Sequence, residues 1–305
     1  MEEVACEKTT GWQDIGEKGT VLGIRFFLVL LSVFGRSAAR GFLAVVMLYY
    51  AAFHGRARRH SRVYLERVGE PTGFANVYRH FLRFGQCALD RVLLIRGSTK
   101  KFDIRSTGRE HLIALQESKT GAILLGAHLG SFEAMRGHAT TFDLPVHVVM
   151  QTSNARRINS VLEQINPQSK VRVIELGDGG IDFVFRIRKL IERGEYVAIL
   201  GDRVGNGAAA VETDFLGSVA SFPTGPYLLA AALSCPVMLT VNLYRGGNRY
   251  DVYCEPFAQR IILPRKGREA AVAAYVKQYA QSLERYCRMA PYNWFNFFDF
   301  WKEPL

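Results

Sequence analysis

Residues 121–133 read Gly-Ala-Ile-Leu-Leu-Gly-Ala-His-Leu-Gly-Ser-Phe-Glu. The apolar run 122–125 predicts a buried strand, and the glycines at 126 and 130 predict a bend around His128. Ser131 is a typical first residue of a helix. His128 is therefore expected in the turn after a strand, at the carboxyl edge of a sheet, where α/β proteins place their sites.

Apolar runs alternate with helical patterns along the rest of the chain, and residues 56–96 are expected to be helical. Strands are expected at 122–125, 146–150, 171–176, 197–200 and 237–243, and helices at 110–118, 131–139, 155–165, 180–193, 223–234 and 268–288. The alternation predicts an α/β fold with a mostly parallel central sheet flanked by helices. We expect an N-terminal membrane-associating segment, residues 1–55, and one domain over residues 56–305.

The composition restricts the class of protein. The 305 residues are 49% hydrophobic and 22% charged, which excludes a mainly disordered chain and a collagen-like repeat. Five widely spaced cysteines without a C-x-x-C pair indicate neither a disulfide framework nor a zinc site. We find no pattern for a metal or a nucleotide cofactor and no nucleic-acid-binding motif.

The N-terminal region suggests association with a membrane. Residues 1–18 carry five acids and two bases, which argues against a secretory signal. Arg25, Arg36 and Arg40 leave uncharged runs of only 10 and 13 residues between 26 and 53. At about 100° per residue these arginines share one helix face, opposite a wide apolar face. We expect a helix, or a pair broken at Gly35 or Gly41, that lies flat in the headgroup layer. A core helix and a true span are the alternatives.

Basic residues are concentrated just after this segment. Residues 54–109 hold thirteen bases and four acids, an excess of nine positive charges within a total of +11. Such a cluster attracts the anionic lipids of the cytoplasmic leaflet. It would also attract an acidic protein partner.

The spacing of His128 and Glu133 suggests an acid–base pair. The two side chains can meet only if His128 lies before the first helical turn, which the glycines at 126 and 130 allow. A carboxylate that accepts a hydrogen bond from one imidazole nitrogen leaves the other nitrogen to act as a base. The alternative is a buried histidine with both nitrogens satisfied and a glutamate favoured by the helix dipole.

Three segments follow one another along the chain: Leu-Gly-Ala-His-Leu-Gly-Ser-Phe-Glu at 125–133, Ile-Leu-Gly-Asp-Arg-Val-Gly at 199–205, and Phe-Leu-Gly at 215–217 followed by Phe-Pro-Thr-Gly-Pro at 222–226. With these segments and the apolar, basic N-terminus, the sequence resembles the lysophospholipid acyltransferase superfamily, and within it the branch of lipid A biosynthesis (lauroyl/myristoyl) acyltransferases. The resemblance covers nearly the whole chain.

The resemblance implies a fold like that of glycerol-3-phosphate acyltransferases and transfer of an acyl chain from a thioester to a hydroxyl. The family's base and carboxylate correspond to His128 and Glu133, and the acid of its second motif corresponds to Asp202. Arg203 stands where lipid A enzymes commonly have Gln or His, and an aromatic segment at 291–301 replaces their basic C-terminal motif. These departures resemble the predicted-acyltransferase subgroup found with aryl polyene or other specialised lipid pathways.

The expected site therefore includes catalytic and substrate-binding residues. His128 and Glu133 are the expected catalytic pair, and the expected substrate-binding residues are Gly130, Ser131, Asn154, Arg156, Asp202 and Arg203. Backbone N–H groups after Gly130, or Arg203 or Arg156, are candidates for stabilising the oxyanion. For the aromatic residues at 294–301 we expect core or interfacial packing, with an acyl-chain pocket as the alternative.

The expected partners follow from this chemistry. The donor is acyl carrier protein or acyl-CoA, the acceptor is a lipid or glycolipid, and no nucleic acid is expected. The expected location is the cytoplasmic face of a bacterial inner membrane, with peripheral or monotopic attachment. A non-catalytic adaptor of the same fold and an acyl thioesterase are the alternative functions.

Overall fold

The structure is a computed structural model, and it describes residues 21–95, 97–131, 144–150, 172–175, 180–205 and 207–301. For residues 21–28, 172 and 181 only the backbone is described. Glu133, Asn154 and Arg156, and the helices expected at 131–139 (beyond residue 131) and 155–165, lie outside the described residues.

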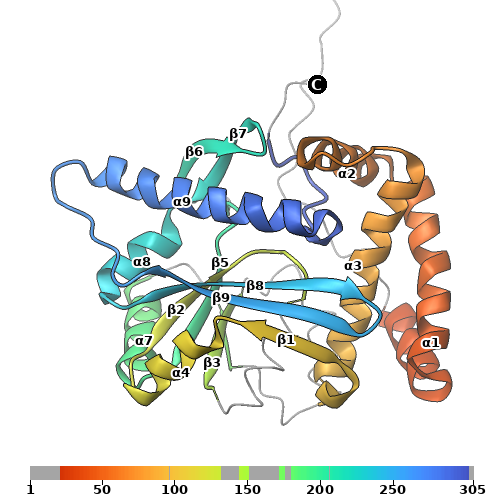
Figure 1. The fold of residues 1–305 in the computed structure, drawn as a ribbon, viewed down its shortest axis with the longest axis horizontal. Coiled ribbons are helices and arrows are strands. Elements are labelled where there is room, and N and C mark those ends of the chain that lie inside the picture. Colours follow the sequence, from red (N-terminus) through yellow and green to blue (C-terminus); the bar gives the residue numbers. More distant parts are fainter. Residues whose placement is uncertain are drawn as a thin grey trace, which may run out of the picture.

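A seven-stranded sheet with the strand order β1-β9-β8-β2-β5-β3-β4 forms the centre of the molecule (Figure 1). Every described pairing in it is parallel except that between β8 and β9. The strands are β1 (Asp103–Thr107), β2 (Ala122–Gly126), β3 (Val146–Met150), β4 (Arg172–Glu175), β5 (Tyr196–Leu200), β8 (Val237–Gly246) and β9 (Arg249–Ala258), with a separate hairpin of β6 (Ala210–Phe215) and β7 (Ser218–Pro223). The predicted mostly parallel α/β fold is confirmed.

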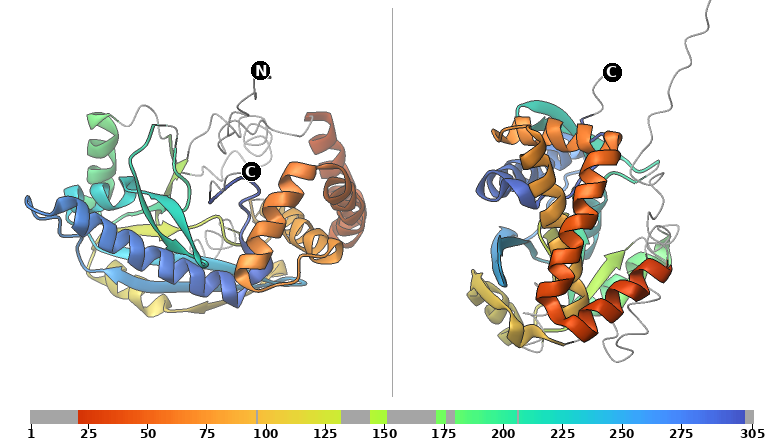
Figure 2. Two further views of the ribbon diagram at one scale, coloured as in Figure 1. Left: turned by 90° about the horizontal axis from the view of Figure 1, so that it is seen from above. Right: turned by 90° about the vertical axis from the view of Figure 1, so that its right-hand side faces the viewer.

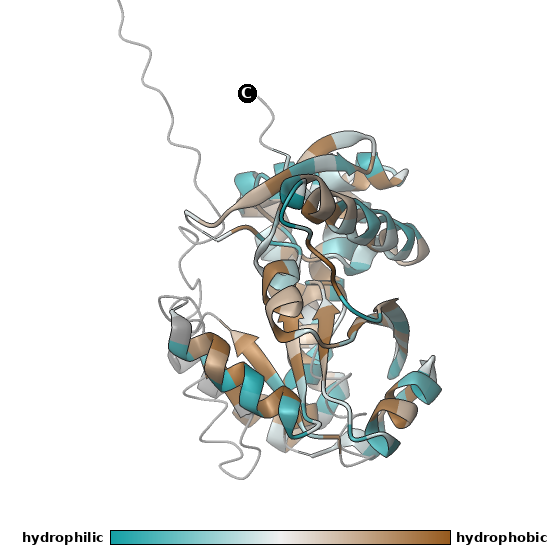
Figure 3. Ribbon diagram, turned by 90° about the vertical axis from the view of Figure 1, so that its left-hand side faces the viewer, coloured by the Kyte–Doolittle hydropathy of each residue, from teal (hydrophilic) through white to brown (hydrophobic). Residues whose placement is uncertain are grey.

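Helices cover both faces of this sheet. They are α1 (Val21–Phe53), α2 (Gly55–Val68), α3 (Phe74–Ile95), α4 (Arg109–Glu117), α7 (Ile181–Glu192), α8 (Gly225–Leu233) and α9 (Arg268–Met289), with short 3-10 turns η2 (Thr99–Lys101) and η4 (Pro291–Asn293). Ile123 and Leu125 of β2 belong to the hydrophobic cluster that contains α9, whereas Ala122 and Leu124 belong to the cluster packed by α4. The central strands are accordingly apolar on both faces (Figure 3).

The five strands expected from apolar runs are all present, with shifts of a few residues at their ends. The prediction missed β1, β6, β7 and β9. β9 pairs antiparallel with β8 and carries Asp251, Glu255 and Pro256 among its apolar residues, so it forms no continuous apolar run. The β6–β7 hairpin is partly exposed and turns at Leu216 and Gly217, both with positive φ, as a tight hairpin turn requires.

Helix α1 bends at Gly35, one of the two glycines at which a break was expected, where φ is 75° and ψ is −176° (Figure 2). Two of the three arginines of the expected basic face, Arg36 and Arg40, are turned toward the protein. Arg36 forms a two-pronged ion pair with buried Asp90 of α3 at 2.7 and 2.8 Å. Arg40 donates to the carbonyl oxygen of Gly247 and to the Tyr244 hydroxyl. These contacts fix the part of α1 after the bend to α3 and to the β8–β9 turn.

The outer face of α1 is apolar. Its large exposed side chains are Val29, Val33, Phe34, Phe42, Val45, Leu48, Tyr49 and Phe53. The stretch Val29–Phe53 is long and apolar enough to cross a membrane by length and composition. In the described part of this helix the exposed surface is mainly apolar, because Arg36 and Arg40 are engaged with the rest of the protein. The division of the chain at residues 55 and 56 stays a prediction.

His80 links α2, α3 and the segment after α9. It is fully buried, one ring nitrogen lies 2.9 Å from the Ser61 hydroxyl, and the other lies 2.8 Å from the carbonyl oxygen of Trp294. Burial lowers the pKa of His80 to about 4, although the Trp294 carbonyl favours the charged form. The imidazole is therefore neutral in the folded protein at neutral pH.

We expect His80 to make the protein sensitive to acid. Its folded-state pKa is below the unfolded value, so its contribution to stability is present above about pH 6.5 and is lost as the pH falls toward 4. The wild type should lose unfolding free energy between pH 6.5 and 4, and in His80→Phe this loss should be smaller by roughly 3 kcal/mol. Urea unfolding at several pH values measures the difference. Ser61→Ala removes a partner but no titrating group, so it should keep the wild-type slope. An unchanged slope in His80→Phe would contradict the assignment.

Candidate functional site

His128 follows the end of β2 in the bend that the glycines create. The carbonyl oxygen of Gly126 accepts hydrogen bonds from the backbone N–H of Gly201 and from the Tyr279 hydroxyl, at 2.9 and 2.8 Å. Gly130 has φ +69°, and a Cβ there would lie 1.8 Å from the carbonyl oxygen of Asn242 on β8. Only glycine therefore fits at position 130, and the loop 127–130 is held against the neighbouring strand.

Asp202 reaches His128 from the next strand. It lies just after β5, which pairs in parallel with β2, so the carboxyl ends of the two strands are adjacent. One carboxylate oxygen, Oδ1, lies 2.8 Å from His128 Nδ1, and the other, Oδ2, accepts the backbone N–H of His128 at 3.0 Å. The Asp202 side chain is fully buried, whereas 30% of the His128 side chain is exposed. The carboxylate thus orients a histidine that remains accessible.

Two further N–H groups donate to Oδ2 of Asp202. Trp294 Nε1 and Asn296 Nδ2 each donate to Asp202 Oδ2 at 3.0 Å. Both residues come from the segment after α9, which pairs with the loop of His128 through an antiparallel bridge between Leu129 and Trp294. Among the described residues no hydrogen-bond partner is present for His128 Nε2.

The pKa values favour a neutral imidazole beside an ionised carboxylate. Burial and the charge of Arg203 lower the pKa of His128 below 6.5 and outweigh the opposing effect of Asp202. Burial acts to raise the pKa of Asp202, but the charge and hydrogen bond of His128, together with Arg203 and Asn296, lower it strongly overall. Near pH 7, Nδ1–H therefore donates to Asp202 and Nε2 carries a free electron pair.

Arg203 balances the charge of Asp202. Its Nε donates to Asn296 Oδ1 at 2.7 Å and its Nη2 donates to the carbonyl oxygen of Phe295 at 3.2 Å. Burial lowers the pKa of Arg203 to about 10, against the attraction of Asp202. Asn296 thus contacts both charged residues, with its amide nitrogen on Asp202 and its amide oxygen on Arg203.

The structure brings five of the eight expected site residues together at the ends of β2 and β5. These are His128, Gly130, Ser131, Asp202 and Arg203. Ser131 is buried, and the backbone N–H of Gly130 donates to the carbonyl oxygen of Asn293 at 2.8 Å, so Gly130 N–H does not serve an oxyanion. Since Glu133 lies outside the described residues, its role as the orienting acid stays a prediction.

Sequence reasoning missed three features of this site. Asp202 was expected to bind substrate, whereas in the structure its carboxylate is hydrogen-bonded to His128. Trp294 is in the core, as expected for an aromatic segment, but its indole N–H also reaches Asp202. Asn296 was not singled out. The one available signal was the pair of asparagines at 293 and 296 within an aromatic run, since buried amides need partners.

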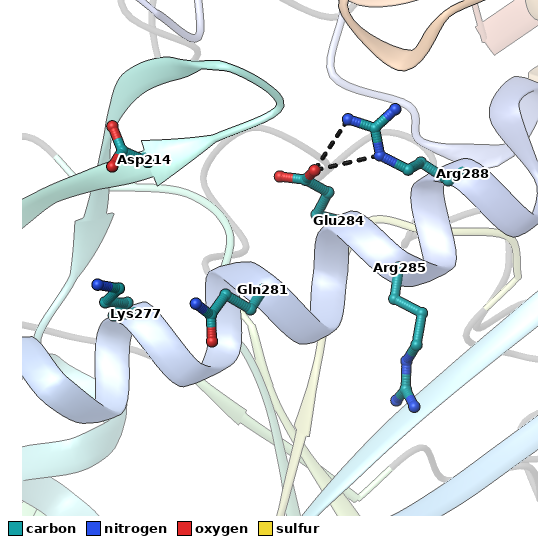
Figure 4. A pocket seen from close by; sticks show the side chains of 6 residues that line it. All are labelled: Asp214, Lys277, Gln281, Glu284, Arg285 and Arg288. Carbon is teal, nitrogen blue, oxygen red and sulfur yellow. Dashed lines mark hydrogen bonds and ion pairs between the residues drawn. The ribbon is translucent and has the colours of Figure 1, made fainter.

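A polar hollow of about 680 Å³ lies elsewhere, between α9 and the β6–β7 hairpin (Figure 4). It is lined by Asp214, Lys277, Gln281, Glu284, Arg285 and Arg288. Glu284 pairs with Arg288 of the same helix and also accepts the backbone N–H of Leu216, and this second bond joins the hairpin to the helix. None of the lining residues belongs to the site of His128.

Comparison with known families identifies one that covers most of the chain. The family model described as bacterial lipid A biosynthesis acyltransferase matches residues 15–303, which is nearly the whole chain. No curated protein matches the chain.

Proposed function

Since the chain belongs to the bacterial lipid A biosynthesis acyltransferase family, we propose that it transfers a fatty acyl chain from a thioester to a hydroxyl of a lipid or glycolipid, with His128 as general base. Family membership implies acyl transfer to a lipid acceptor. The observation that carries the assignment of the base is the pairing of His128 Nδ1 with buried Asp202 in an imidazole that stays partly exposed.

The proposed reaction needs no nucleophile from the protein. His128 Nε2 accepts the proton of the acceptor hydroxyl while the hydroxyl oxygen attacks the thioester carbonyl carbon. A tetrahedral intermediate forms, and its negative oxygen requires a positive charge or N–H donors nearby. The carbon–sulfur bond then breaks, and the thiolate takes the proton from the imidazolium. Asp202 keeps the proton on Nδ1 throughout and stabilises the imidazolium that forms between the two proton transfers.

The roles of the other expected residues are proposals. Arg203 is our candidate for stabilising the oxyanion, because its charge acts on both members of the pair. Ser131, Asn154 and Arg156 are proposed to bind substrate, and Glu133 is proposed as a second carboxylate acting on His128. For the acceptor we propose a molecule other than lipid A, as in the aryl polyene-associated subgroup, because of Arg203 and the aromatic segment at 291–301.

We expect purified protein to move a labelled acyl chain to a lipid acceptor, detected by mass spectrometry. The donors to compare are acyl carrier protein and coenzyme A carrying the same chain, and the acceptors are a lipid A precursor and a total lipid extract. His128→Ala controls for contaminating enzymes. Release of free fatty acid at full rate without acceptor would indicate a thioesterase. Binding of acyl carrier protein without turnover, unchanged in His128→Ala, would indicate an adaptor.

We further propose that the enzyme sits on the cytoplasmic face of the inner membrane through the outer face of α1. Eight large apolar side chains are exposed on this helix. Arg36 and Arg40 hold it to α3 and to the β8–β9 turn, so an attached α1 would bring the whole sheet to the lipid surface. This arrangement suits an enzyme whose acceptor is a lipid.

Replacing Phe34, Val45 and Phe53 with Ser should weaken binding to phosphatidylethanolamine–phosphatidylglycerol vesicles. Each buried apolar side chain contributes about 1.5–3 kcal/mol, so a loss of at least about 10-fold in the partition coefficient is expected from sedimentation. The matched control replaces Phe185, Val219 and Ile262, three exposed apolar residues outside α1, with Ser. Equal losses in the two triple variants would rule out α1 as the anchor.

A further inference from the structure

The segment 293–296, which follows α9, forms one wall of the site. Its backbone pairs with the loop of His128 in both directions: Gly130 N–H donates to the carbonyl of Asn293, and Phe295 N–H donates to the carbonyl of His128, at 2.8 and 2.9 Å. The position of the His128 backbone is thus set by residues far along the chain.

This segment is itself firmly anchored. The side chain of Asn293 accepts from the backbone N–H of Tyr244 at 2.7 Å and donates to the carbonyl of Tyr244 at 3.2 Å, which joins the segment to β8. Trp294 is fully buried against the rings of Tyr64, Phe215 and Phe300. Because its ring is held by this packing, the indole N–H of Trp294 points in a fixed direction.

We propose that Trp294 and Asn296 are positioning residues that set the basicity of His128 through Asp202. The inference rests on the proposed role of His128 as the base. The Trp294 Nε1–H and the Asn296 Nδ2–H both donate to Asp202 Oδ2, which also receives the backbone N–H of His128. These three donors fix Oδ2, so Oδ1 is the oxygen presented to the imidazole at 2.8 Å.

The donors also determine how strongly Asp202 attracts a proton on His128. Hydrogen bonds to a carboxylate disperse its negative charge and weaken its pull on a neighbouring imidazolium. Removing one donor should therefore concentrate charge on the carboxylate and raise the pKa of His128. The imidazole would then be protonated over a wider range of pH and would be a free base over a narrower one.

Trp294→Phe removes the indole N–H but keeps an aromatic ring. We expect an upward shift of roughly 0.5–1 unit in the pKa of His128, measured by NMR titration of ¹⁵N-labelled histidine in the full chain. The acid limb of the kcat/KM profile should move to higher pH by the same amount, since it reports the base of the free enzyme. The pKa readout does not depend on knowing the substrate.

Trp301→Phe is the matched control. It removes an indole N–H from the same aromatic cluster, but this N–H donates to the carbonyl of Phe215 rather than to Asp202. The pKa of His128 should stay at the wild-type value. Equal pKa values for His128 in the wild type, Trp294→Phe and Trp301→Phe would overturn the proposal.

Asn296→Leu provides a second test if Trp294→Phe does not fold. It removes the other donor to Asp202 and keeps a similar side-chain volume, and Arg203 retains its bond to the carbonyl of Phe295. The pKa of His128 should again rise, and an unchanged value would count against the inference. If the wild type transfers no acyl group while the pKa shifts appear, the proposed function fails and the positioning role stands.

Discussion

Asp202→Asn is expected to lower kcat for acyl transfer by about a thousand- to ten-thousand-fold, the size of effect that follows when a catalytic histidine loses its correct tautomer. The substitution preserves the shape of the side chain. Its effect comes from the direction in which the new amide must point.

Three N–H groups converge on Asp202 Oδ2, from the His128 backbone, Trp294 and Asn296, each at 3.0 Å. An amide at position 202 must place its oxygen there, because an NH₂ group would face three donors. Its NH₂ group then faces His128 Nδ1 and donates to it. The remaining imidazole proton moves to Nε2, and the nitrogen that should take a proton from the acceptor no longer has a free electron pair.

The measurement is the single-turnover rate of acyl transfer, together with the tautomer of His128 by ¹⁵N NMR. Asp251→Asn is a suitable control, since Asp251 is a buried carboxylate paired with Arg245 and Arg249 and has no contact with His128 among the described residues. That variant should keep its activity. A loss of less than about 10-fold in Asp202→Asn would show that another carboxylate, such as Glu133, orients the base.

Gly130→Ala should disrupt both the fold and the site. The added Cβ would lie 1.8 Å from the carbonyl oxygen of Asn242 and 2.8 Å from its carbonyl carbon, and both atoms belong to the backbone of β8. No side-chain rotation can relieve this contact, so the loop must move. We expect a loss of roughly 3 kcal/mol or more in unfolding free energy. A shift of about 1 Å in His128 would also lower kcat by about a hundredfold.

Gly217→Ala separates the steric contact of the new Cβ from the cost of a left-handed backbone in a residue other than glycine. Gly217 also has a positive φ, +80°, but nothing lies within 4 Å of the Cβ that it would gain. Its substitution should destabilise by only about 1 kcal/mol, the cost of a left-handed backbone alone. Equal values for Gly130→Ala and Gly217→Ala in urea unfolding would mean that the loop 127–130 is not confined by β8.

The sequence was sufficient for the central strands β2, β5 and β8, because these strands are largely buried and form continuous apolar runs, whereas the mostly exposed edge strand β1 was missed. β2 and β5 were placed in this way, and His128 and Asp202 follow at their carboxyl ends. The antiparallel β9 escaped prediction because its polar residues interrupt the pattern.

The contact between His128 and Asp202 could not be read from spacing. The two residues are 74 positions apart, and their meeting depends on β5 lying next to β2 although β3 and β4 come between them in the chain. A pattern search favours a carboxylate five residues away over one that a strand order brings near. Likewise, the direction of the Arg36 and Arg40 side chains followed from buried Asp90 and from the β8–β9 turn, neither of which is visible in the periodicity of α1.

The bonds between the loop of His128 and residues 293–296 also bear on biosynthesis. Trp294 and Asp202 are separated by 92 residues in the chain, so the ribosome makes the imidazole and its carboxylate long before it makes the residues that hold them. A nascent chain that has emerged only as far as α9 would have an incomplete centre. Catalytic competence should therefore arise late in translation, after all strands of the sheet have been synthesised.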